Sequence, residues 1–225
     1  MQHRTTRGRI SYRDARGVER GREWFHITEA PDGSRTMRTT SEIDDSEILR
    51  DVTLSLGADW RPRDCYVRVS VADALVGAGW FEFGDRETHG TVHSSSLGRL
   101  SQILATPERP PMFGAHQVAG DGWQAALLHD CDPDVPRRVD GILLSSALPN
   151  GASGPMLATT SMVAELVGPE RITVPAGTFD TMHYRFSPDG LDPEDVWVLP
   201  DGLVLVRSEW ARYETTYELA ELDQR

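Results

Sequence analysis

The stretch Arg171-Ile-Thr-Val-Pro-Ala-Gly-Thr-Phe-Asp-Thr-Met-His-Tyr-Arg-Phe186 decides the fold, because it reads as two β-strands joined by a central turn. The proline and the glycine in its middle suit a turn, since proline fixes its own φ and glycine tolerates a positive φ. In the second half, Met182, Tyr184 and Phe186 alternate with polar side chains and therefore share one face of a strand. The stretch predicts an antiparallel hairpin that carries Tyr184 on its apolar face.

Similar patterns continue on both sides of this hairpin. Pro200-Asp-Gly202 separates two further strand-like runs and has the composition of a tight hairpin connection. Strand signals recur without a linker, and all-β proteins of this length are common as single domains. The sequence therefore predicts an all-β fold, with one domain over residues 1–225 and an antiparallel meander. Strands are expected at residues 4–12, 18–28, 35–44, 47–56, 63–71, 75–83, 88–94, 139–148, 157–167, 195–199, 203–210 and 213–219.

The pattern changes between residues 96 and 136. Leu97–Leu104 has apolar residues at a spacing that predicts one or two helical turns. Prolines at positions 107, 110 and 111 then exclude regular structure, and Asp121 is a good N-cap for a short helix. We expect this irregular segment, residues 96–136, to interrupt the sheet and to cap its open mouth.

The sequence also carries a resemblance to a known family. Thr173-Val-Pro-Ala-Gly-Thr-Phe-Asp-Thr181, a strand with a tryptophan and the Asp201-Gly202 hairpin together resemble an uncharacterised bacterial domain-of-unknown-function family. That family is similar in shape to lipoprotein-carrier and lipocalin-like proteins. The resemblance implies a long curved antiparallel sheet or open barrel around an apolar cavity, and it implies no reaction. Many such relatives are exported.

Composition excludes several classes of partner. The 225 residues carry a formal net charge of −12, with a pI near 5.0. This charge argues against nucleic acid and anionic membranes as partners. No apolar run approaches the roughly 20 residues that span a bilayer, and the first residues lack a signal-peptide pattern. We therefore expect a cytoplasmic protein without membrane insertion, and a homodimer is left open.

Metal-binding and nucleophile motifs are absent from the sequence. His89 and His93 are four residues apart, but on the expected strand they lie roughly 13 Å from each other, too far for one metal ion. No phosphate-binding glycine loop or nucleophile elbow follows a strand. The sequence therefore predicts no metal and no cofactor.

Three residues are candidates for proton transfer. His116 lies in the irregular segment expected over the cavity, where a histidine can move protons without a cofactor, although it also suits an ordinary surface position. Tyr184 is expected to be buried, so its hydroxyl group needs a partner, which is either an ordinary hydrogen bond or a ligand. His93 is the next candidate, and its alternative is an outward position on a strand.

The remaining candidates concern ligand binding. An inward Arg50 or Arg68 needs a carboxylate from the protein or from a ligand, whereas an outward arginine is simply solvated. Trp80 and Trp197 suit a pocket for an aromatic ligand or ordinary core packing. The predicted ligand-binding residues are Arg50, Arg68, Trp80, Trp197, Phe113 and Met182.

Two functions fit these features. The first is a cofactor-independent lyase or isomerase that uses general acid–base catalysis on a hydrophobic small molecule, aromatic or aliphatic, held in the β cavity. The second is a non-catalytic carrier or sensor of a hydrophobic small molecule. Several proton-competent residues near the expected cavity favour the enzyme.

Overall fold

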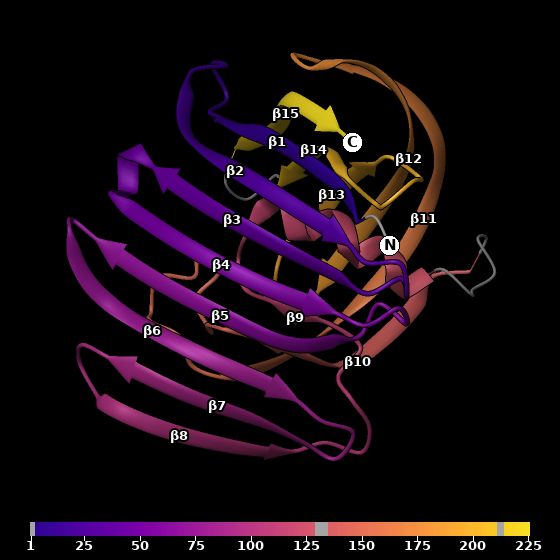
Figure 1. Cartoon of the computed structure of the whole chain (residues 1–225). Helices are drawn as coiled ribbons and strands as arrows, with labels where there is room; N and C mark the ends of the chain where they lie inside the picture. Colours follow the sequence, from indigo (N-terminus) through magenta and orange to yellow (C-terminus); the bar gives the residue numbers. More distant parts are fainter. Residues whose placement is uncertain (1–2, 129–134, 211–213) are drawn as a thin grey trace.

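Fifteen strands form one large curved sheet that does not close on itself (Figure 1). The computed structural model describes residues 3–128, 135–210 and 214–225. The strand order is β8-β7-β6-β5-β4-β3-β2-β1-β15-β14-β13-β12-β11-β10-β9. Neighbouring strands are antiparallel except β9 and β10, which are parallel. The all-β, curved-sheet prediction is confirmed.

The described chain consists of successive strands, with a short 3₁₀ turn after β3 and a 3₁₀ helix after β9. They are β1 (Arg4–Arg13), β2 (Glu19–Glu29), β3 (Arg35–Ile43), the 3₁₀ turn η1 (Asp44–Ser46), β4 (Ile48–Leu56), β5 (Pro62–Val71), β6 (Ala74–Phe83), β7 (Glu87–Ser94), β8 (Gly98–Ala105), β9 (Phe113–Gly114), the 3₁₀ helix η2 (Val118–Leu128), β10 (Arg137–Leu144), β11 (Ala158–Val174), β12 (Gly177–Pro188), β13 (Glu194–Val198), β14 (Leu205–Trp210) and β15 (Thr215–Gln224).

The hairpin that decided the fold is the pair β11–β12. The two strands pair from Met162 opposite Pro188 to Val174 opposite Gly177. Only two residues separate the last pair, and Gly177 has the positive φ (143°) that the sequence pattern anticipated. The predicted hairpin is therefore confirmed, and β11 joins the strand expected at residues 157–167 and the first strand of the hairpin into one continuous strand.

The helical turns predicted at Leu97–Leu104 are wrong. Residues Gly98–Ala105 form β8, which pairs with β7 at one edge of the sheet. Leu100 and Leu104 alternate with exposed residues, as in a strand that is covered on one face. A short apolar run fits both the period of a helix and the period of a strand, and here pairing with β7 favours the strand.

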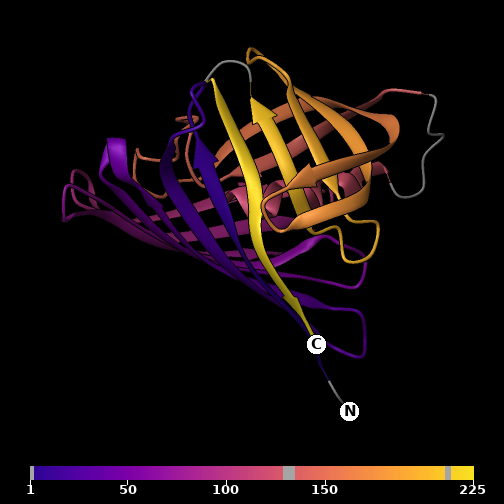
Figure 2. The ribbon, with the colours of Figure 1, turned by 90° about the horizontal axis from the view of Figure 1, so that it is seen from above.

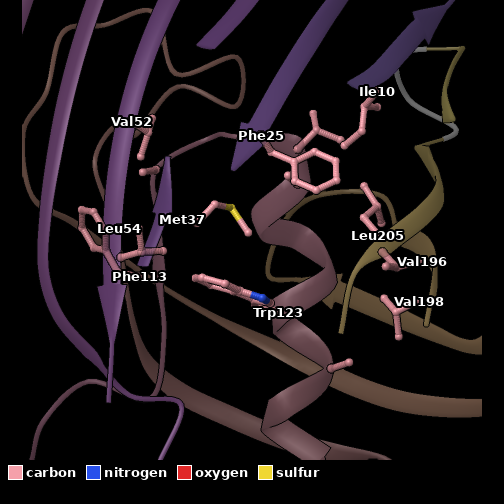
Figure 3. Packing of buried hydrophobic residues seen from close by; sticks show 14 of the residues in the cluster. Ile10, Phe25, Met37, Val52, Leu54, Phe113, Trp123, Val196, Val198 and Leu205 are labelled. Atoms are coloured by element: carbon pink, nitrogen blue, oxygen red, sulfur yellow. The ribbon is translucent and has the colours of Figure 1, made fainter. Parts of the chain in front are cut away.

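The helix η2 lies inside the curve of the sheet, between the first strands and the last ones (Figures 1 and 2). It begins at Val118, three residues before the predicted N-cap, Asp121. Figure 3 shows the Trp123 side chain on this helix, with Met37 from one side of the sheet and Val198 from the other. The helix therefore fills the core, where a cap over the mouth was expected. Residues 129–134 of the predicted cap segment lie outside the described residues.

The loop that joins β10 to β11 covers the inner face of the first half of the sheet. Gly77 and Gly79 on β6 make room for Pro155, since a Cβ at either glycine would lie 2.9 Å from that proline ring. The backbone N–H of Leu157 donates to the side-chain carbonyl of Gln102 on β8, at 2.9 Å. This loop thereby links the β8 end of the open sheet to the strands that carry the cavity.

Candidate functional site

A cavity of about 200 Å³ lies between η2, the last strands and the β10–β11 loop. Its lining includes the exposed residues Ser46, Leu148 and Asn150, so the cavity reaches the surface there. An engineered apolar cavity of about 150 Å³ holds benzene, so this one fits a molecule with about one ring. The apolar and aromatic lining residues include Tyr12, Ile43, Ile48, Met112, Val118, Leu144, Met162, Leu191, Trp210 and Tyr217.

Arg50 lies on the inner face of β4 and lines the cavity. Its side chain is buried, with only 3% of the residue exposed. One terminal nitrogen donates to the backbone carbonyl of His116 and the other to that of Asn150. Arg50 therefore ties the segment before η2 to the loop at the mouth of the cavity.

Gly151 allows this close arrangement. A Cβ at this position would lie 2.8 Å from the Arg50 Nη2 atom and 2.8 Å from the His116 Cβ atom. Its φ of 68° is also a conformation that favours glycine. The mouth loop reaches Arg50 and His116 only because residue 151 has no side chain.

His116 lines the cavity, as expected, but its ring is held by backbone carbonyl groups. Its Nε2 atom lies 3.3 Å from the carbonyl oxygen of Ser146, and the ring also interacts with the carbonyl of Pro149. Burial, followed by the positive charge of Arg50, lowers the pKa of His116 to about 4. The imidazole is therefore neutral near pH 7 and binds the mouth loop.

Two carboxyl groups face the same cavity. Burial raises the pKa of Glu194 on β13 to about 7. Burial, followed by the charge of Glu194, raises the pKa of Asp121 on η2 well above its ordinary value. The Gln124 amide donates to Asp121 Oδ1 at 3.0 Å and also hydrogen-bonds Glu194, while Ser208 Oγ donates to Glu194 Oε1 at 2.5 Å. Glu194 can therefore exchange a proton near neutral pH.

A third buried carboxyl group, Glu23 on β2, fixes η2 in place. Its Oε2 atom accepts hydrogen bonds from the Tyr12 hydroxyl group at 3.0 Å and the Ser41 hydroxyl group at 2.6 Å. The first two N–H groups of η2, those of Val118 and Ala119, donate to the same carboxyl group at 3.1 and 2.7 Å. Glu23 thus performs the capping that the sequence assigned to Asp121.

The other two proton-transfer candidates lie away from the cavity. Tyr184 is on the inner face of β12, as predicted, but its ring is only half-buried and stacks near Phe186, with ring centres 6.2 Å apart. Tyr184 is not among the cavity-lining residues. His93 is exposed on β7, which matches the alternative interpretation of an outward strand position.

Of the predicted ligand-binding residues, only Arg50 lines the cavity. Arg68 points outward and lies 3.7 Å from Asp51, and Trp80 is 43% exposed. Trp197 is on the outer face of β13, where its ring stacks on His183 with ring centres 4.2 Å apart. Arg68, Trp80 and Trp197 do not line the cavity because only alternate residues of a strand point to the inner face of the sheet.

The remaining two predicted residues pack in or against the core. Phe113 is buried between the rings of Phe81 and Phe83, at ring-centre distances of 5.1 and 4.7 Å. Met182 is half-buried against the core cluster. The methionines that line the cavity are Met112 and Met162.

Sequence reasoning missed the two cavity carboxyl groups. Glu194, Val196 and Val198 occupy alternate positions of β13, so strand parity places the glutamate on the same face as two buried valines. The strand was predicted to begin at residue 195, one position too late to include it. Asp121 was assigned only the role of a helix cap.

Neither a metal cluster nor a membrane-crossing helix is found in the part of the chain that the structure describes. No group of three or more His, Cys, Asp and Glu residues in residues 3–128, 135–210 and 214–225 is arranged to hold a metal ion. Within the same residues, no helix has both the length and the apolar character needed to cross a membrane.

The fold is similar to solved structures of domains of unknown function. The chain is similar to a beta-barrel-like protein of the domain of unknown function DUF1849 from Brucella abortus, with a TM-score of 0.58 and 11% identity over 99% of this chain and 97% of that one. A DUF1089 family protein from Pseudomonas aeruginosa gives a TM-score of 0.48 and 11% identity over 85% and 90%. No family model and no curated protein matches the sequence. The likeness to the Brucella abortus protein shows the fold alone.

Proposed function

We propose that this protein is a cofactor-independent lyase or isomerase that transfers protons within a small, largely apolar molecule bound in the cavity. The observation that carries this proposal is the pair of carboxyl groups, Glu194 and Asp121, in the cavity wall. General acid–base catalysis is most efficient when the pKa of the catalytic group is near the working pH, and the pKa of Glu194 is raised to about 7.

In this mechanism, Glu194 takes a proton from a carbon atom of the substrate. An isomerase returns the proton to another atom of the substrate, and a lyase expels a leaving group instead. The raised pKa of Asp121 favours its protonated form, which donates a hydrogen bond to the oxygen atom that gains negative charge. Gln124 and Ser208 position the two carboxyl groups, and His116 holds the mouth loop.

The second candidate is a carrier or sensor, and the apolar part of the cavity wall favours it. Met112, Leu144 and Met162 contribute that part. This function agrees with the resemblance to lipoprotein-carrier and lipocalin-like proteins. A carrier or sensor has only to bind the small molecule, and no proton is transferred.

Hydrogen–deuterium exchange distinguishes the two functions, because it detects proton abstraction from carbon whether or not a complete reaction follows. The protein is incubated in D₂O with a panel of small aromatic and aliphatic molecules in which a carbonyl group acidifies a neighbouring C–H bond. NMR then measures the deuterium that enters each molecule. We expect the rate to fall by roughly 10²–10⁴-fold in Glu194→Gln, the usual contribution of a general base.

Glu209→Gln on the adjacent strand is the matched control, because the Glu209 side chain is 41% exposed and pairs with Arg207. It should retain the wild-type rate. An unchanged rate in folded Glu194→Gln excludes this residue as the base. Saturable binding without exchange in any molecule supports the carrier.

A further inference from the structure

Arg50 is a buried positive charge that forms no ion pair among the described residues 3–128, 135–210 and 214–225. Its terminal nitrogens donate to two backbone carbonyl groups, which carry no net charge, and its Nε atom has no hydrogen-bond partner. Arg35 on the adjacent strand β3 is more ordinary, because it pairs with Glu29 at 3.2 Å. Burying a guanidinium group is costly unless an anion compensates its charge.

The buried carboxyl group of Glu23 attracts Arg50 but does not pair with it directly. Glu23 belongs to the same cross-strand row, in which Glu23 lies opposite Ser41 and Ser41 lies opposite Arg50. A whole strand therefore separates Glu23 from Arg50, and the Glu23 carboxyl group already accepts four hydrogen bonds from other donors. Glu23 and Asp121 attract Arg50 without forming an ion pair with it, so the place of a direct carboxylate partner is open to a ligand.

The cavity is the place from which an anion can reach Arg50, since Arg50 lines it. The rest of the wall limits what that anion can be. Glu194 lines the same cavity and, when ionised, repels a ligand with two negative charges, such as a phosphate monoester. A volume of about 200 Å³ leaves room for one compact apolar group. A planar carboxylate matches the donor geometry of guanidinium.

We propose that the cavity binds a small monocarboxylate, whose carboxylate group pairs with Arg50 and whose compact apolar body, about one ring in size, lies against the apolar wall. This inference rests on the proposed function only in using the same cavity, and it names the class of substrate or cargo. A carboxylate on Arg50 also gives a substrate a fixed orientation toward Glu194 and Asp121.

The unmodified protein gives the first test. Calorimetry or ligand-observed NMR compares benzoate and cyclohexanecarboxylate with their uncharged amides, benzamide and cyclohexanecarboxamide, and with the cation benzylamine. We expect the carboxylates to bind at least about tenfold more tightly than the amides, because only the carboxylates compensate the charge of Arg50. Equal binding of acid and amide, tighter binding of benzylamine, or no binding of either carboxylate at millimolar concentration overturns the proposal.

Two substitutions assign the preference to Arg50. Arg50→Met should lose it, leaving the acid and the amide within about twofold of each other. Arg50→Lys keeps the charge and should retain part of the preference, which provides an informative variant if Arg50→Met does not fold. Arg68→Met, at an outward position of the neighbouring strand, is the matched control and should keep the full preference. A full preference in folded Arg50→Met contradicts the assignment.

The outcomes separate this inference from the proposed function. Carboxylate preference without deuterium exchange in any molecule removes the acid–base mechanism and leaves a carrier of carboxylates. Exchange into uncharged molecules without any carboxylate preference supports the enzyme and removes the role of Arg50.

Discussion

Glu23 and Glu194 are both buried on the inner face of the sheet and both face η2, yet their surroundings differ. Four donors surround the Glu23 carboxyl group, and two of them are the first N–H groups of the helix. Glu194 has the Ser208 hydroxyl group and the shared Gln124 amide, with Asp121 beside it and the cavity in front. Burial raises the pKa of both groups, and hydrogen bonds to the charged form counteract this rise from four donors in Glu23 and from two in Glu194. The comparison separates a carboxyl group that holds the fold from one suited to proton transfer.

The largest expected effect is a loss of stability in Glu23→Ala. The substitution leaves two backbone N–H groups and two hydroxyl groups buried without their acceptor, so the free energy of unfolding should fall by roughly 3–5 kcal/mol. Urea denaturation measures this change. Glu82→Ala, at an exposed strand position, is the control and should stay within about 0.5 kcal/mol of the wild type. A loss below about 1 kcal/mol for Glu23→Ala would remove its role as the helix anchor.

The next effect has the opposite sign and depends on pH. Because the pKa of Glu194 is about 7 in the folded protein and its ordinary value is 4.5, the folded state binds more protons between these pH values. Its contribution to stability is therefore fully present below pH 4.5 and is lost as the pH rises through 7. Glu194→Gln should be more stable than the wild type at pH 8 by about 1–3 kcal/mol, and much closer to it at pH 5.

Urea denaturation at the two pH values checks this prediction. His116 titrates in the opposite sense, since its lowered pKa of about 4 makes stability fall as the pH drops below 6.5. Both proteins contain His116, so its contribution cancels in the difference between variant and wild type. The same difference at pH 5 and pH 8 would show that burial does not perturb Glu194.

The smallest expected effect tests one donor of the Glu23 site. Tyr12→Phe removes the hydroxyl group that donates to Glu23 and keeps the ring packed against Tyr217, so it should cost about 1 kcal/mol. Tyr66→Phe, at a half-exposed position on β5, should cost less. Thermal or urea denaturation compares the two variants. Equal stabilities would mean that three donors suffice for Glu23.

The parts of the molecule that depend on local pattern were predictable. The β11–β12 hairpin follows from alternation and turn residues within one stretch, and His116 was placed at the cavity because its segment breaks the strand pattern. Arg50 lies among apolar residues at alternate positions along β4, so the sequence allowed the prediction that its side chain points inward. The edge strand β8 was wrongly predicted to be helical, because its short apolar run fits the period of a helix as well as that of a strand.

The composition of the site was not predictable from local pattern. Asp121, Glu194 and Arg50 come from η2, β13 and β4, and only the register of a sheet with fifteen strands brings them to one cavity. An error of one residue at the start of β13 hid Glu194. Tyr184 was placed on the correct face, but the cavity reaches β12 at Pro188 and not at Tyr184, so the correct face did not ensure the correct position.

The position of β1 beside β15 has a consequence for chain connectivity. Thr5 and Arg225 exchange two backbone hydrogen bonds of 2.8 Å, so the first and last described strands are neighbours in the sheet. The two free edges, β8 and β9, are consecutive in the sequence. A circular permutant that joins residue 225 to residue 4 and opens between β8 and β9 would therefore run through the sheet from one edge to the other in sequence order. In the present fold, β1 and β15, the first and last described strands, are neighbours in the middle of the strand order.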